Sequence, residues 1–163
     1  MFILIKEDSE IEQLSILAKE IWNQHYSPII GRDQVDYMIK LLQSKEAIKE
    51  DIEKKDYQYY FIDNNNKKIG YFAIVSKDNS LFLSKLYIKA SNRGEGIGKS
   101  VINFITLEAK NRDLNKISLT VNKYNENSIE FYKKNGFIIV DSIIFDLGEG
   151  YFMDDYKMEL NNI

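Results

Sequence analysis

The chain has 163 residues, which suits one domain and leaves little room for two. Its composition, 44% hydrophobic and 29% charged with a net charge of −3, is that of an ordinary globular protein, and it argues against duplex nucleic acid as a partner because phosphate binding needs a basic face. The absence of cysteine excludes disulfides, a thiol nucleophile and cysteine-ligated metals, and one histidine is too few for a typical zinc site, so we expect no metal. No apolar run approaches the roughly 20 residues of a membrane span, and we expect a cytoplasmic protein with no membrane partner.

The first third of the chain predicts a short strand and two helices. Residues 2–6 form the strand, and Ser9 can cap a helix whose apolar stripe ends at about Asn23. A loop that contains the only proline follows. The second helix begins near Asp33 and continues through the charged segment EAIKEDIEKK.

The rest of the chain alternates between strands and helices. Residues 57–63 and 68–75 form an antiparallel hairpin, because the turn between them is rich in asparagine. Further strands are expected at 81–90, 116–122, 137–146 and 150–160, and further helices at 101–109 and 127–135. The order β-α-α-β-β-β-α-β-α-β-β predicts an α/β (α+β) fold with a mixed sheet flanked by helices, in a single domain over residues 1–163.

The segment NRGEGIGKS lies between a predicted strand and a predicted helix, and it is compatible with more than one phosphate motif. A Walker A loop would need glycine where Arg93 stands, and a dinucleotide fingerprint would need glycine where Lys99 stands. The pattern R-x-x-G-x-G is satisfied without a mismatch by Arg93, Gly96 and Gly98. A plain flexible turn is the alternative.

The third pattern suits a pyrophosphate. Gly96 and Gly98 have no Cβ, so the backbone can approach an anion closely. The first amides of the following helix point toward such a ligand, and the helix dipole favours negative charge there. Arg93 and Lys99 add positive charge.

A second motif lies in LTVNKYNENSIEFYKKNGF, where a strand leads into a helix that ends at Gly136. Its pattern is N-x-x-[AS]-x-x-x-Y-x-x-x-G-F. Together with LYIKASNRGEGIGKS, this segment resembles the GCN5-related N-acetyltransferase (GNAT) superfamily in order and spacing. The resemblance covers nearly the whole chain and implies a mostly antiparallel central sheet. The segment HYSPIIGRDQVDYM and the ending GYFMDDYKMEL also resemble the bacterial branch that acetylates polyamines and related amines.

The resemblance implies acetyl-CoA as cosubstrate and assigns residues to it. The backbone of Leu86, Tyr87 and Ile88 would pair with the pantetheine arm, and the amide region of Leu86 or Tyr87 could polarise the thioester carbonyl. The pyrophosphate cradle would comprise Arg93, Gly94, Glu95, Gly96, Ile97, Gly98, Lys99 and Ser100. The remaining CoA contacts would come from Asn122, Asn125 and Ser128.

The implied reaction is direct attack of a primary amine on the thioester, which needs no protein nucleophile. A fixed backbone amide can stabilise the charge on the carbonyl oxygen. Tyr132, which the resemblance places beside the sulfur, can protonate the leaving thiolate as general acid. Packing in the core is the alternative role for Tyr132.

Candidate acceptor residues come from the first helix and the last strand. His25 could act as a base because its ordinary pKa lies near neutrality, and a surface histidine is the alternative. Asp154 shares the parity of the apolar residues of its strand, and a buried carboxylate needs a partner such as an amine. Trp22 and Tyr26 could line the pocket, although packing is the simpler reading.

The sequence therefore predicts an N-acetyltransferase whose acceptor is a small amine or polyamine. Two alternatives remain open: an enzyme that acetylates protein N-termini or lysines, and a CoA-binding sensor without turnover. A P-loop nucleotide hydrolase is disfavoured by Arg93 and by the lack of a Walker B strand. The resemblance also allows for a homodimer.

Overall fold

A computed structural model describes residues 1–163, and the chain divides into two compact units. The N-terminal unit comprises Met1–Val75 and Lys85–Glu95, and the C-terminal unit comprises Ser76–Ser84 and Gly96–Ile163. Strand β4 (Ser80–Ile88) contributes its first half to the C-terminal unit and its second half to the N-terminal unit.

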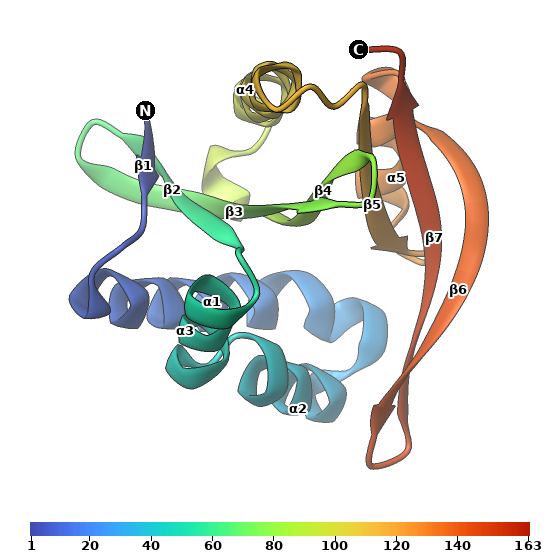
Figure 1. The fold of residues 1–163 in the computed structure, drawn as a ribbon. Coiled ribbons are helices and arrows are strands. Elements are labelled where there is room, and N and C mark those ends of the chain that lie inside the picture. The colour runs from blue at the N-terminus through green and yellow to red at the C-terminus, as the bar shows by residue number, and fades with distance from the viewer. The chain divides into compact units, whose positions relative to one another are not determined.

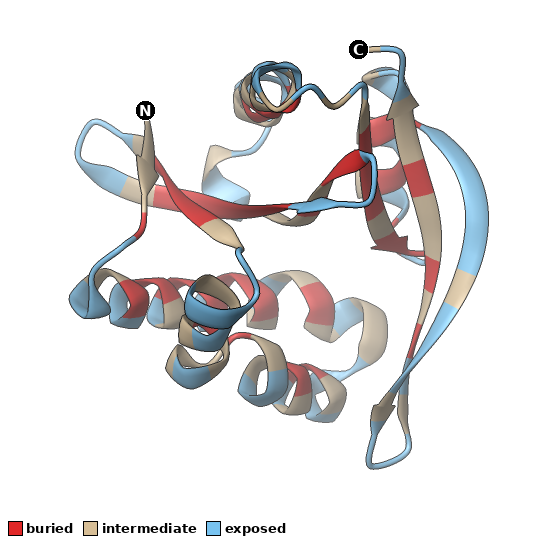
Figure 2. Cartoon of the chain, viewed as in Figure 1, coloured by how far each residue is buried: buried red, intermediate tan, exposed pale blue.

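The N-terminal unit combines strands with three helices (Figure 1). The strands follow the order β1-β2-β3-β4, and β1, β2 and β3 run antiparallel. Apolar side chains of α1 pack with Tyr59 and Phe61 of β2 and with Tyr71 and Ala73 of β3 in one buried cluster, and Figure 2 shows the buried stripe along α1. The bounds are β1 (Phe2–Leu4), α1 (Asp8–Ile30), α2 (Arg32–Leu42), α3 (Lys45–Lys54), β2 (Gln58–Asn64), β3 (Lys67–Lys77) and the short 3-10 helix η1 (Ala90–Asn92).

The first helix differs from the prediction at both ends. It begins at Asp8, where Glu7 and Glu10 form a reciprocal capping box, so Ser9 is not the cap. It also continues past Asn23 to Ile30. Pro28 lies near the end of α1, and burial of Tyr26 gives the added turns a stabilising apolar contact.

The second predicted helix is two helices. α2 ends at Leu42 and α3 begins at Lys45. The side chain of Ser44 accepts a hydrogen bond from the Ala47 amide at 3.2 Å, which caps α3. Gln43, at the break, is fully buried and bonds to a tyrosine of β3. A tertiary contact therefore decides a break that the helical pattern does not show.

The C-terminal unit contains α4 (Ile97–Asn111), β5 (Lys116–Asn122), α5 (Glu126–Lys134), β6 (Ile138–Gly148) and β7 (Tyr151–Asn161). Its strands follow the order β4-β5-β7-β6, with β4 and β5 parallel and the other pairs antiparallel. The last two strands form one long, curved hairpin, seen in orange and red in Figure 1. The predicted bounds of β5 are confirmed at both ends.

Strand β6 is the last strand in this order, and most of its residues are exposed. Large apolar residues are among them: Ile138, Ile139, Val140, Ile144 and Phe145. The homodimer expected from the resemblance stays a prediction. Leu107 of α4 is also exposed, at 57%.

The predicted fold class is confirmed: helices accompany a mixed sheet in which β4 and β5 pair in parallel, while β1–β2, β2–β3, β5–β7 and β6–β7 pair antiparallel. One extra helix distinguishes the element order from the predicted one, because the second helix is split. The single domain stays a prediction. None of the helices combines the length and the apolar character that crossing a bilayer requires.

Candidate active site

The second half of β4 carries the predicted pantetheine contacts Leu86, Tyr87 and Ile88, which are all half-buried. A Cβ atom added to Gly70 of β3 would collide with the carbonyl oxygen of Tyr87 and would lie 3.1 Å from Cα of Ile88. Glycine at position 70 therefore allows β3 to lie close against this segment of backbone. This close contact between β3 and β4 fixes the position of the backbone segment that the resemblance assigns to cofactor binding.

The side chain of Tyr87 belongs to an aromatic cluster in the N-terminal unit. Its ring lies 5.3 Å from Trp22, 5.9 Å from Tyr26 and 5.5 Å from Tyr71, between ring centroids. The hydroxyl groups of Tyr26 and Tyr87 are 3.1 Å apart. Trp22 and Tyr26 are buried, so both contribute to the packing of this cluster. A role for them in lining the acceptor pocket stays a prediction.

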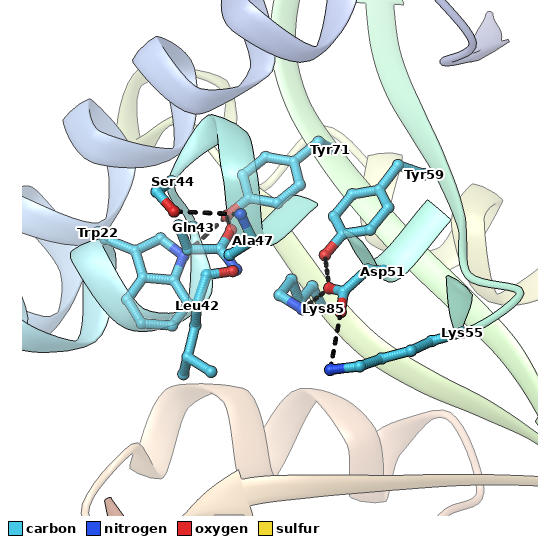
Figure 3. Close-up of polar contacts among 10 residues, drawn as sticks. All are labelled: Trp22, Leu42, Gln43, Ser44, Ala47, Asp51, Lys55, Tyr59, Tyr71 and Lys85. Atoms are coloured by element: carbon cyan, nitrogen blue, oxygen red, sulfur yellow. Dashed lines mark hydrogen bonds and ion pairs between the residues drawn. The ribbon is translucent and has the colours of Figure 1, made fainter. Parts of the chain in front are cut away.

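A buried hydrogen-bond chain supports this cluster, and Figure 3 shows its members. The indole Nε1 of Trp22 donates to the hydroxyl of Tyr71 at 2.8 Å, and that hydroxyl donates to Oε1 of Gln43 at 2.7 Å. The chain ties α1 to β3 and to the end of α2. Burial raises the pKa of Tyr71 well above its ordinary value, so the phenol stays neutral and keeps its donor.

A second polar group lies on α3, β2 and β4, also in Figure 3. Oδ2 of Asp51 accepts a 2.6 Å hydrogen bond from Tyr59 and lies 3.9 Å from Nζ of Lys85. The Lys85 ammonium also lies 5.3 Å from the centre of the Tyr59 ring and 5.7 Å from that of Tyr57. Lys85 immediately precedes Leu86, so this group anchors the start of the candidate cofactor segment.

His25 and Arg93 come together in the N-terminal unit. Arg93 Nη2 lies 3.4 Å from His25 Nδ1, and Arg93 Nε donates to the carbonyl of Ile88 at 3.1 Å. Burial, together with the Arg93 charge, lowers the pKa of His25 to about 4. Such a weak base is poorly matched to an ammonium with an ordinary pKa of about 10, so the finding weighs against the predicted base role. Contact between His25 and the acceptor stays a prediction.

The N-terminus of α4 in the C-terminal unit is built from the predicted cradle. Gly96 precedes the helix in the left-handed region, with φ of 76°, and no atom lies within 4 Å of a Cβ added there. A Cβ added to Gly98 would lie 2.8 Å from Cζ of Phe131 in α5, so this glycine is required for helix packing. The open backbone at Gly96 and the first-turn amides of a 15-residue helix fit a pyrophosphate.

The connection from β5 to α5 holds the second motif. Asn125 is the buried N-cap of α5, and its amide donates to the carbonyl of Asn122 at 3.0 Å. Oδ1 of Asn122 accepts from the Tyr124 amide at 2.9 Å. Ser128 is half-buried in the first turn, and Tyr132 is buried one turn further, with its ring centroid 5.4 Å from that of Phe137. Their cofactor and acid roles stay predictions.

The two aspartates of β7 differ from the expectation. Asp154 is the half-exposed one, and its Oδ1 lies 2.9 Å from Nζ of Lys123. Asp155 is the buried carboxylate. The alternation of residues along the strand correctly placed Asp154 on the same face as Met158. The prediction failed because it assumed that only this face of β7 is buried. Met153 and Asp155 are buried on the other face, so the sequence argument chose the wrong acid as the buried one.

The structure thus gathers the predicted residues within each unit. Trp22, His25, Tyr26, Tyr87 and Arg93 meet in the N-terminal unit, and the glycines of α4 meet α5 in the C-terminal unit. Sequence reasoning missed Gln43, Asp51 and Asp155. The signal available for Asp155 was the Asp-Asp pair itself, if both faces of the strand had been considered. No group of three or more His, Cys, Asp or Glu side chains could hold a metal ion.

Comparison with known proteins identifies the class to which this site belongs. The family model described as "Acetyltransferase (GNAT) domain" matches residues 27–159. The chain belongs to the GNAT acetyltransferase family and is an acetyl-CoA-dependent N-acetyltransferase.

Individual relatives extend the comparison. The chain is 25% identical to the spermidine N(1)-acetyltransferase of Thermoplasma acidophilum over 82% of its own length and 85% of the relative's. The structure of PaiA N-acetyltransferase from Thermoplasma acidophilum in complex with coenzyme A superposes with a TM-score of 0.80 at 23% identity, covering 99% of each chain. The ribosomal-protein-alanine N-acetyltransferase of Brucella melitensis has a TM-score of 0.70 at 16% identity, also covering 99% of each chain. These two structures share the fold.

Proposed function

We propose that the protein transfers the acetyl group of acetyl-CoA to a small primary amine, with a polyamine such as spermidine as the first candidate acceptor. The observation that carries this proposal is the similarity to a spermidine N(1)-acetyltransferase over most of both chains. The net charge of −3 is compatible with a cationic acceptor.

Cofactor binding uses backbone groups. The N-terminal amides of α4, at Ile97 to Lys99, hold the pyrophosphate, supported by the helix dipole. The backbone at Leu86 to Ile88 pairs with the pantetheine arm, and one of its amides donates to the carbonyl oxygen of the thioester. Because a fixed amide does not have to reorient as charge develops, it stabilises the transition state more than the ground state.

The chemical step is a direct attack. The amine nitrogen forms a bond to the thioester carbon, the carbon–sulfur bond breaks, and the thiolate takes a proton from the hydroxyl of Tyr132. Before the attack, the incoming ammonium gives one proton to a base. The second proton, which the nitrogen loses as the amide forms, restores the hydroxyl of Tyr132. No cysteine is present to form an acyl-enzyme intermediate, in keeping with direct transfer.

Thiol release from acetyl-CoA tests the acceptor. The panel contains spermidine, simple diamines, and peptides with a free N-terminus or a lysine. Spermidine and diamines should release thiol faster than the peptides. Faster turnover of peptides would favour a protein acetyltransferase, and tight acetyl-CoA binding with no turnover on any acceptor would favour a sensor.

Substitution of Tyr132 tests the acid role. Tyr132→Phe should retain affinity for acetyl-CoA and lower kcat by about 10²-fold or more, since general acid catalysis contributes roughly that much. Tyr124→Phe is the matched control, because Tyr124 lies in the loop that leads into the same helix but is 71% exposed. Equal kcat values for the two variants would remove Tyr132 from the mechanism.

A further inference from the structure

Asp155 lies in the middle of the C-terminal unit's sheet. In the antiparallel ladders it stands directly opposite Asn122 of β5 on one side and Ile143 of β6 on the other. Directly opposed residues project from the same face of a sheet. Asp155 therefore shares a face with Asn122, which leads into the helix that carries Tyr132.

The carboxylate is buried and incompletely bonded. Asp155 is only 6% exposed, and its Oδ1 has no hydrogen-bond partner. The carboxylate makes one hydrogen bond within the protein, to Thr120 of β5. Thr120 stands opposite Lys157, two residues along β7 from Asp155. A buried carboxylate oxygen without a donor is costly, and natural proteins retain few such groups without a functional reason.

The charged groups around Asp155 do not supply the missing donor. Lys123 pairs with Asp154, which belongs to the opposite face of β7, and it acts on Asp155 only through its charge. On the face of Asp155, Glu159 lies 3.7 Å from Lys157 and 3.3 Å from Lys116. Asp141 of β6 stands opposite Lys157 on this face. The excess charge on this face is negative, so the missing donor should be a cation from outside the chain.

We propose that Asp155 binds the ammonium group of the acceptor amine and takes its proton before attack. This inference rests on the proposed function and deepens it, because it assigns the base that direct transfer needs. The ammonium N–H bond breaks, its electron pair stays on nitrogen as the nucleophile, and the proton forms an O–H bond on the Asp155 carboxylate. No oxidant, metal or further reactant is required.

The environment makes this transfer feasible. Desolvation lowers the pKa of an ammonium and raises that of a carboxyl, so the two values converge when both groups are buried together. Burial, with a smaller contribution from Asp154, already raises the pKa of Asp155 to about 6. At neutral pH the carboxylate is therefore ionised and ready to accept a proton, yet it is a stronger base than an exposed aspartate.

The test compares two isosteric substitutions at adjacent positions. Asp155→Asn should lower kcat/KM for spermidine by about 10²-fold or more, the scale of general base catalysis, with the dissociation constant for acetyl-CoA unchanged. Asp154→Asn, which loses an ion pair on the opposite face, should change kcat/KM by less than about tenfold, the scale expected for an exposed pair.

A second acceptor separates a base from a structural residue. A fluorinated primary amine that is unprotonated at neutral pH needs no base, so Asp155→Asn should recover most of the wild-type rate with it. In the wild-type enzyme, kcat/KM for spermidine should fall as pH drops through about 6, the pKa of Asp155, and Asp155→Asn should lack this limb.

Three outcomes would overturn the inference: an equal loss with both amines, a parallel loss of acetyl-CoA affinity, or a larger effect from Asp154→Asn. If Asp155→Asn does not fold, the wild-type pH profile decides, and a profile without a limb near pH 6 counts against the inference. Failure of the proposed function is distinct, since the wild-type enzyme would then bind acetyl-CoA and acetylate no amine of the panel.

Discussion

The hydroxyl of Tyr59 donates a 2.6 Å hydrogen bond to Oδ2 of Asp51, and the ring of the same tyrosine lies 5.3 Å from the ammonium of Lys85. One residue of β2 thus connects α3 to β4 immediately before the candidate cofactor segment. The Asp51 charge and burial both raise the pKa of Tyr59, burial being the larger cause, so the phenol remains a donor at all physiological pH values.

Removal of this hydroxyl should destabilise the protein. Tyr59→Phe leaves a largely buried carboxylate without its shortest hydrogen bond, and we expect a loss of about 1–3 kcal/mol in the free energy of unfolding. Urea denaturation of the variant measures it. Tyr57→Phe retains the Tyr59–Asp51 bond and should lose much less; equal losses would mean that the bond contributes nothing specific.

A methyl group at position 98 should disturb the packing of α4 on α5. Because the added Cβ would lie 2.8 Å from Cζ of Phe131, Gly98→Ala should lower the free energy of unfolding by about 1–3 kcal/mol. The double variant Gly98→Ala/Phe131→Leu should recover part of that loss, which thermal or chemical denaturation would reveal. Lys99→Ala, on the exposed neighbour, should stay within about 0.5 kcal/mol of wild type. Additive effects of the two substitutions would contradict the contact.

The stability of the protein should depend on the protonation of Asp155. Its folded pKa of about 6 exceeds the ordinary 3.8, so the folded state binds this proton more tightly than the unfolded state. The resulting stabilisation is complete below about pH 3.8 and is lost as pH rises through about 6. Asparagine has no charge to bury. Asp155→Asn should therefore match wild type near pH 4 and exceed it at pH 7 by at most about 3 kcal/mol, at 1.4 kcal/mol for each pKa unit.

Denaturation of both proteins between pH 4 and pH 8 measures this difference. A variant less stable than wild type at pH 7 would show that the carboxylate is held by interactions that the structure lacks. Greater stability without activity would instead identify Asp155 as a group kept for function at a cost in stability.

Substitution of His25 should leave the pH dependence of turnover unchanged above pH 5. With a pKa of about 4, His25 is already neutral throughout that range and cannot produce a limb in it. His25→Asn keeps an acceptor near the position of Nδ1 for Arg93, so the kcat profile from pH 5 to pH 9 should keep its shape. Disappearance of a limb near pH 6 in this variant would restore His25 as a candidate base.

Local patterns predicted the C-terminal half of the fold well. The alternation in KISLTVN gives β5 with its observed ends, and Gly136 follows the end of α5 with a φ of 92°, as a helix-ending glycine should. In the N-terminal half, propensity rules failed where packing intervenes. α1 extends past Pro28 because its later turns bury Tyr26, and the second helix breaks where Gln43 bonds to Tyr71.

The same contrast between local patterns and tertiary packing applies to the candidate site. Both cofactor motifs are contiguous in sequence, because a glycine-lined helix start and a capped helix are local structures. The proposed acceptor residues depend on burial instead, and there the sequence argument took Asp154, and not Asp155, as the buried carboxylate. A strand's period of two identifies its two faces, but it does not say which of them is covered.

By itself, the sequence determined the class of fold and the cofactor, and it predicted the two segments proposed to bind that cofactor, since each depends on short-range spacing of glycine, asparagine and tyrosine. Only the tertiary structure decided which charges are buried, which hydroxyls are bonded and which carboxylate oxygen of Asp155 lacks a donor. Those properties depend on desolvation and on neighbours contributed by other elements, and the order of residues along one strand does not contain them.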